Sequence, residues 1–156
     1  MPTGAVIEVI LLSEGHDTLR FRVARADQGA CAPDVVARAL AGIPAAAGPA
    51  LLHSTSWRFE EGRIVLTYVA LPDPGGAATL PLRPGFRLRG ADPLNPTVAM
   101  IAPHEVAAHA CRHLAFLRAT DSVVGGIADA HSGLWRLIAE FRPDVAGAVR
   151  MSSVAA

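Results

Sequence analysis

The sequence predicts an α+β protein in which a mixed β-sheet is sandwiched between helices. Two pairs of apolar, alternating segments lie within residues 5–26 and 51–71, and a short polar turn separates the members of each pair. Strand 63–71 is apolar on both sides, as expected for a central strand that helices cover on both faces. From Pro103 onward the apolar spacing becomes helical.

The chain of 156 residues, of which 51% are hydrophobic, is long enough for one domain with its own core. We expect a single domain, with mainly strands and one short helix in residues 1–102 and helices in residues 103–150. The apolar run AVIEVILL is short and contains Glu8, so it predicts neither a signal peptide nor a membrane span. Cys31 and Cys111 lack metal-knuckle spacing, which predicts free thiols in a soluble, cytoplasmic protein.

The charged residues exclude several classes of function. The net charge is zero, so overall charge indicates no nucleic-acid partner. The chain contains 14 basic residues, all of them arginine. Without lysine there is no Schiff-base chemistry, no pyridoxal phosphate anchor and no Walker-type phosphate loop, and we predict no cofactor. Arginine with abundant alanine, glycine and proline is typical of a GC-rich bacterial genome.

The first half of the chain contains two predicted hairpins around a short helix. A loop over residues 13–17 would pair Leu11 with Leu19 and place Glu8 opposite Arg22. Pro33 and Asp34 begin a helix that ends near Gly42. A two-residue turn at Glu61-Gly62 then closes the second hairpin.

In the second predicted hairpin, a regular register places four residues of one strand on an inward-facing side: His53, Thr55, Trp57 and Phe59. The same register pairs Thr55 with Tyr68 and His53 with Ala70.

The second half begins with a proline- and glycine-rich stretch over residues 72–102. It includes an irregular edge strand in TLPLRPGFRLRG and a short buried strand in NPTVAMIA. Helices follow in PHEVAAHACRHLAFLRAT and in SGLWRLIAEFRPDVAGAV, and Gly125-Gly126 interrupts the approach to the second of them.

Four residues are predicted to bind a ligand: His53, Thr55, Tyr68 and Arg38. A histidine on an inward-facing strand, beside a threonine and a tyrosine, can line a pocket between sheet and helix. The alternative is a core histidine that bonds a backbone carbonyl. Arg38 can join Arg20, Arg22 and Arg25 in an anion site, although such arginines more often form a solvated face.

A second group of titratable residues lies in HEVAAHACRH. Glu105, His109 and His113 follow one another at spacings of four and therefore line one stripe of a helix. Such a stripe can hold a divalent metal. It is not the zincin motif, however, and centring the buried stripe on Val106, Ala110, Leu114 and Leu117 places His109 nearly in water. We therefore favour no metal site here and expect a boundary stripe.

The element order, with VVARAL in the short helix, resembles the Nudix fold. The resemblance covers about residues 5–120 in layout, with Arg38 and Leu40 at the family's arginine and apolar positions. The family's glutamates, which hold magnesium, would fall on Ala39, Gly42 and Ile43, and its opening glycine on Ala24. The resemblance thus implies a Nudix-like fold without Nudix hydrolase activity.

Three interpretations of function follow. The first is a non-catalytic domain that binds a small molecule or a partner chain. The second is a metal-assisted hydrolase that uses histidines and carboxylates outside the Nudix box. The third is a homodimeric module that buries the final apolar stripe against a second copy: Leu134, Trp135, Ile138 and Phe141. The alternative for that stripe is intramolecular core, which its helical spacing favours.

Overall fold

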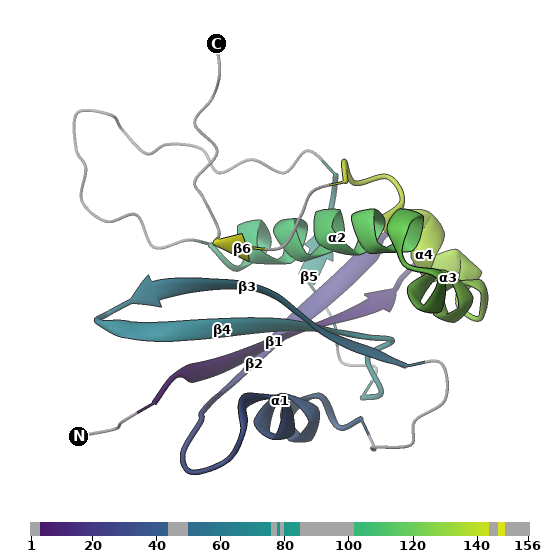
Figure 1. Ribbon diagram of the computed structural model, residues 1–156. Coiled ribbons are helices and arrows are strands. Elements are labelled where there is room, and N and C mark those ends of the chain that lie inside the picture. Colours follow the sequence, from purple (N-terminus) through teal and green to yellow (C-terminus); the bar gives the residue numbers. More distant parts are fainter. Residues whose placement is uncertain are drawn as a thin grey trace, which may run out of the picture.

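A computed structural model describes residues 4–43, 50–75, 78, 80–84, 102–143 and 147–148. It shows an α+β fold built on one mixed sheet with helices on both faces (Figure 1). The elements are β1 (Val6–Glu14), β2 (Leu19–Asp27), α1 (Pro33–Ala41), β3 (Leu51–Glu60), β4 (Arg63–Leu71), β5 (Leu80–Leu82), α2 (Pro103–Thr120), α3 (Ser122–Asp129), α4 (Ser132–Ile138) and β6 (Gly147–Ala148).

The strands lie in the order β5-β2-β1-β4-β3-β6. Each hairpin, β1–β2 and β3–β4, is antiparallel, and the two hairpins join through parallel pairing of β1 with β4. Helix α1 covers one face, and α2 to α4 lie on the other (Figure 1). We call these the α1 face and the α2 face. The prediction that strand 63–71 is central is confirmed, and helices cover both of its faces except near Ile64, which is 41% exposed on the α1 face.

The predicted register of the first hairpin is wrong by three residues. A turn closed by the Gly15 amide, which donates to the Thr18 carbonyl at 2.8 Å, lets the strands extend until Glu14 faces Leu19. Glu8 therefore lies opposite Arg25 rather than Arg22. The sequence does not fix this register, because β1 is apolar on both faces and its pattern fits either alignment.

The second hairpin is confirmed at its turn and is wrong at its far end. Glu61 and Gly62 have φ angles of 52° and 77°, the left-handed geometry of a two-residue hairpin turn. The predicted pairs hold from Glu60 to Ser56, where a β-bulge at Thr55 shifts the partners by one. His53 pairs with Val69 instead of Ala70 and changes face.

Helix α1 matches its predicted bounds because its end signals are strong. Proline occupies the first turn, and Gly42 ends the helix with φ 69°, a conformation that favours glycine. Among the described residues, eight buried side chains form the core of the α1 face: Ile7, Val9, Leu11, Ala37, Ala41, Ile43, Tyr68 and Ala70.

The α2 face carries the larger core, in which Trp135 and Ile138 of α4 are fully buried with Phe21 and Leu12 of the first hairpin. The residues proposed for a dimer contact on the final helix are therefore intramolecular core. Helix α4 ends at Ile138, well before the predicted end of that helix.

Gly125-Gly126 lies inside α3 instead of interrupting the chain. The Asp121 carboxylate accepts hydrogen bonds from the amides of Val123 and Val124, at 2.8 and 3.3 Å, and starts this helix despite the glycines.

The remaining predictions for this half are confirmed in part. Of the predicted edge strand, Leu80–Leu82 forms β5, which pairs with β2, and its residues 79 and 85–90 lie outside the described residues. Residues 95–101 of the predicted buried strand also lie outside them. Cys31 is exposed and Cys111 buried, and both are free. Among the described residues, none of the helices combines the length and apolar character needed to cross a bilayer.

Candidate functional site

Two of the histidines singled out in the sequence meet between β3 and α2. The ring centroids of His53 and His113 lie 5.2 Å apart, with the rings tilted by 55°. The bulge at Thr55 makes this contact, because a regular strand would have turned His53 to the α1 face. His113 is buried and also stacks on Phe116, whereas His53 is half-buried.

The orientation of the His53 ring is fixed by its own strand. Its Nδ1 lies 2.7 Å from the Ser54 carbonyl oxygen, which can only accept a hydrogen bond. Nδ1 therefore carries the proton, and in the neutral ring Nε2 keeps its lone pair.

The stripe of Glu105, His109 and His113 lies against the protein rather than toward water. His109 is only 9% exposed, so the prediction that it lies nearly in water is wrong. The prediction treated α2 as a surface helix, but α2 contacts α3, α4 and the sheet and is buried around most of its circumference. Among the described residues, no group of three or more His, Cys, Asp or Glu side chains is placed to hold a metal ion.

The four predicted ligand-binding residues do not share one pocket. His53 faces α2, whereas Tyr68 projects from the other face into the core beneath α1. The Tyr68 hydroxyl donates to the Asp34 carboxylate of α1 at 2.5 Å. Burial and this carboxylate raise the pKa of Tyr68 well above its usual value, so the phenol stays protonated. Arg38 belongs to α1, on the Tyr68 side of the sheet.

The Thr55 side chain also has a hydrogen-bond partner within the fold. Its hydroxyl is buried and donates to the Thr67 carbonyl oxygen at 3.3 Å. The neighbouring Ser56 was not singled out in the sequence, yet its hydroxyl oxygen is buried and makes no hydrogen bond with a described residue.

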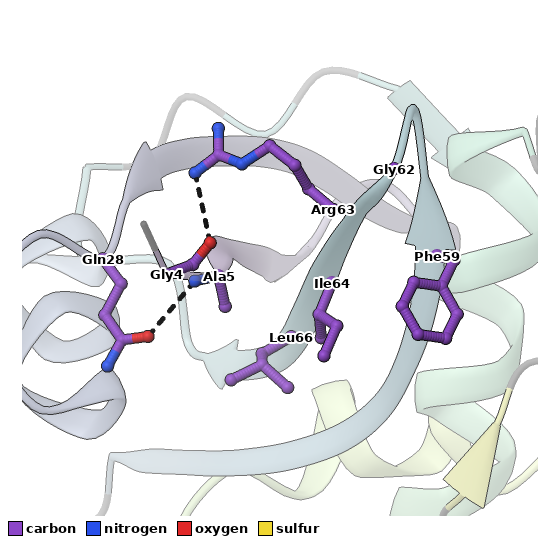
Figure 2. A pocket seen from close by; sticks show the side chains of 8 residues that line it. All are labelled: Gly4, Ala5, Gln28, Phe59, Gly62, Arg63, Ile64 and Leu66. Atoms are coloured by element: carbon purple, nitrogen blue, oxygen red, sulfur yellow. Dashed lines mark hydrogen bonds between the residues drawn. The ribbon is translucent and has the colours of Figure 1, made fainter. Parts of the chain in front are cut away.

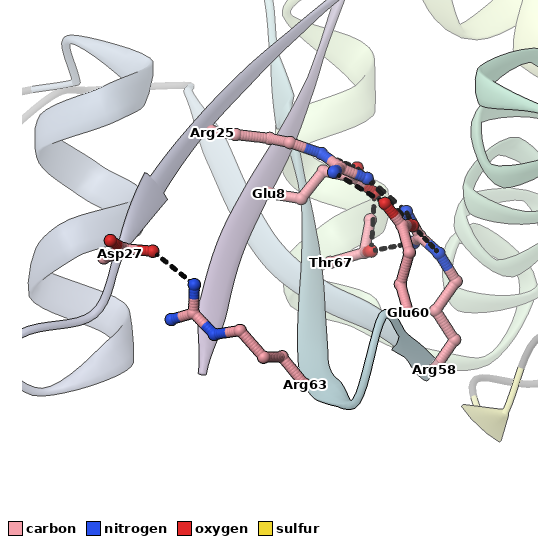
Figure 3. Close-up of polar contacts among 7 residues, drawn as sticks. All are labelled: Glu8, Arg25, Asp27, Arg58, Glu60, Arg63 and Thr67. Carbon is pink, nitrogen blue, oxygen red and sulfur yellow. Dashed lines mark hydrogen bonds and ion pairs between the residues drawn. The ribbon is translucent and has the colours of Figure 1, made fainter. Parts of the chain in front are cut away.

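A network of charged side chains lies on the α2 face at the hairpin tip (Figure 3). Glu8 and Arg58 are buried in it, Glu60 is half-buried and Arg25 is exposed. Arg58 binds Glu8 at 2.9 Å and Glu60 at 3.0 Å, and Arg25 binds the same two carboxylates at 2.6 and 2.9 Å. Thr67 donates to Glu8 at 2.9 Å. Burial raises the pKa of Glu8, but the hydrogen bonds and charges of Arg58 and Arg25 outweigh it, so the pKa lies below its usual value.

The arginines of β2 do not gather into an anion site. Arg25 binds Glu8 and Glu60 of the network, and Arg22 binds the buried Asp73 at 2.6 Å. One signal in the sequence could have revealed the network: Glu8 lies within an otherwise apolar strand, and such a buried carboxylate needs a cationic partner.

The opposite side of the same hairpin tip is apolar and open. Phe59 is 67% exposed, Trp57 44% and Ile64 41%, so the prediction that Trp57 and Phe59 face inward is wrong. The rings of Trp57 and Phe59 pack edge to face at 5.9 Å. We call Trp57, Phe59, Ile64 and Leu66 the apolar tip. In Figure 1 this end of the hairpin projects beyond α1.

Beside the apolar tip is a hollow of about 600 Å³. Figure 2 shows Ile64 and Leu66 between Phe59 on one side and Gln28, Gly4 and Ala5 on the other. Arg63 closes the rim, where it donates to the Gly4 carbonyl at 3.4 Å and binds Asp27 at 2.8 Å. The hollow therefore has an apolar floor, and the charge of Arg63 at its edge is balanced by Asp27.

Comparison with protein-family models, with curated protein sequences and with solved structures finds no match for this chain.

Proposed function

We propose that this protein is a non-catalytic binding domain and that its binding surface is the apolar tip. One observation carries the proposal: three large apolar side chains are exposed together on one sheet face, where burial in the core does not explain them. Contiguous apolar patches with exposed aromatic residues are typical of protein interfaces.

The occupant we propose is a second copy of the chain, as in the homodimeric interpretation but on a different surface. The aromatic pair Trp57 and Phe59 forms a ridge directly beside the hollow, so a two-fold axis can seat the ridge of each copy in the hollow of the other. Charge does not oppose this arrangement, because Arg63 is balanced by Asp27 and the chain has no net charge.

The Nudix-like architecture and the lack of hydrolase activity remain part of this proposal. The sheet between α1 and the later helices supports the architecture. Ala39, Gly42 and Ile43 at the positions of the family's glutamates support the lack of magnesium-dependent hydrolysis. We retain cytoplasmic location as part of the same proposal.

Analytical ultracentrifugation over a range of concentrations tests the proposal. A standard interface has about 20–30 residues on each side, whereas the apolar tip has only four, so we expect a weak, concentration-dependent dimer. Phe59→Arg should make the protein monomeric. Val123→Thr is the control, because Val123 is 71% exposed on α3, away from the hairpin. A monomer at about 1 mM, or a dimer that survives Phe59→Arg, would overturn the proposal.

A further inference from the structure

The separation of the His53 and His113 rings matches that of two imidazoles bound to one metal ion. In a tetrahedral site with zinc–nitrogen bonds of about 2.0–2.1 Å, two bound imidazoles have their ring centroids about 5 Å apart. The observed separation is 5.2 Å. The rings come from two different elements, β3 and α2, so an ion bound by both would tie the sheet to its covering helix.

The His53 ring also makes the kind of hydrogen bond that metal-binding histidines typically make. Metal-binding histidines usually donate their second ring nitrogen to a carbonyl or carboxylate, which fixes the tautomer. His53 does so through Nδ1 and the Ser54 carbonyl oxygen, at 2.7 Å. Its Nε2 is therefore the nitrogen that can bind a cation.

Solvent access and local charge are compatible with a cation here. His53 is half-buried, whereas His113 is only 4% exposed and both of its ring nitrogens are buried, so an ion has to enter from the His53 side. The nearest cationic side chain along the same face of β3, Arg58, is neutralised by Glu8 and Glu60.

We propose that His53 and His113 form a two-histidine site for a divalent cation of borderline softness, such as Zn²⁺ or Co²⁺. Among the described residues, no third His, Cys, Asp or Glu side chain is grouped with these two, so water completes the coordination sphere. Such a site binds metal reversibly and keeps open positions for a further ligand.

The test uses the protein carrying Cys31→Ser, because an exposed thiol such as that of Cys31 can itself bind zinc. Titration with CoCl₂, followed by visible absorbance, and with ZnCl₂, followed by calorimetry, measures affinity and stoichiometry. We expect one ion per chain. His53→Ala and His113→Gln should each weaken binding by about tenfold or more. His16→Ala in the exposed β1–β2 turn is the control and should bind as the parent does.

Two results would overturn the proposal: no saturable binding of either ion up to about 1 mM, or parental affinity in His53→Ala. Because His53 is half-buried in a strand, this variant is expected to fold, and circular dichroism verifies it. If His113→Gln does not fold, His53→Ala alone decides. The ultracentrifugation test of the apolar tip is independent, since that surface lies on the opposite face of the hairpin.

Discussion

Residues 57–60 of β3 show opposite chemistry on the two faces of the sheet. On the α2 face, Arg58 is only 7% exposed and reaches the buried Glu8. On the α1 face, Trp57 and Phe59 are exposed. Within residues 57–60 the charged side chains therefore point toward the covered face and the aromatic ones toward water, the reverse of the usual distribution.

The two faces differ in what they contribute: the charged residues of the α2 face stabilise the fold, and the exposed aromatic residues of the α1 face do not. Buried charges are tolerated on the α2 face because each carboxylate of the network has guanidinium partners, and removal of one partner would leave an uncompensated charge. The exposed aromatics have no comparable structural role in the monomer. Stability should thus depend on one face of these residues and binding on the other.

Arg58→Ala should give the largest effect. It leaves Glu8 buried with part of its compensating charge removed, and we expect a loss of about 3–5 kcal/mol in the free energy of unfolding. Urea denaturation measures it. Arg63→Ala, which breaks the pair with the 64% exposed side chain of Asp27, is the matched control and should cost about 1 kcal/mol or less. Equal losses in the two variants would contradict the assignment.

The second largest effect should come from acid, which weakens the ion pairs of Glu8 and Glu60 on the α2 face. Burial raises the pKa of Glu8, but Arg58 and Arg25 lower it overall. The hydrogen bond from Arg25 leads in lowering that of Glu60. Both folded pKa values lie below the ordinary 4.5, so this stabilisation is present above that pH and is lost as pH falls below it. Urea midpoints from pH 7 to pH 3 should fall, and less steeply in Glu8→Gln. Parallel curves for the two proteins would argue against the network.

Tyr68→Phe should have a smaller effect, because it removes one hydrogen bond at the covered part of the α1 face. We expect a loss of about 1 kcal/mol, since Asp34 is exposed and can be hydrated in its place. Urea denaturation measures the loss, and dimerisation should be unchanged. A change in self-association would mean that the apolar tip extends beneath α1.

Phe59→Thr should have the smallest effect on the folded monomer. The Phe59 ring is mostly exposed to solvent and threonine has a high β-strand propensity. The free energy of unfolding should therefore change by about 0.5 kcal/mol or less. Thermal denaturation at low concentration, where a dimer is not populated, measures it. A loss as large as that of Arg58→Ala would show that Phe59 belongs to the core.

The parts of the fold that were predicted correctly have local signals. Pro33 and Gly42 delimit α1, and Glu61-Gly62 fixes the second turn, whatever the rest of the chain does. The register of β1 with β2 has no such signal, because a strand that is apolar on both faces accepts several alignments. The burial of His109 depends on how α3 and α4 pack around α2, which periodicity within α2 does not reveal.

For the candidate site, the sequence pointed to His53 and His113 as candidate residues but did not predict that their rings are in contact. That contact depends on the bulge at Thr55, for which no glycine or proline gave a signal. Trp57 and Phe59 were assigned to the core because their alternation matched a buried face. Alternation tells which residues share a face, and only tertiary packing tells whether that face is covered.

The bulge at Thr55 gives β3 two alternation phases in one strand. The solvent-exposed positions run Ser54, Trp57, Phe59, a step of three followed by a step of two. A saturation mutagenesis profile of this strand should therefore show its tolerance for polar substitutions slip by one position at Thr55. Deletion of Thr55 would make this spacing even and leave His53 facing α2, whereas loss of the bulge at unchanged length would turn everything before it, His53 included, to the other side of the sheet.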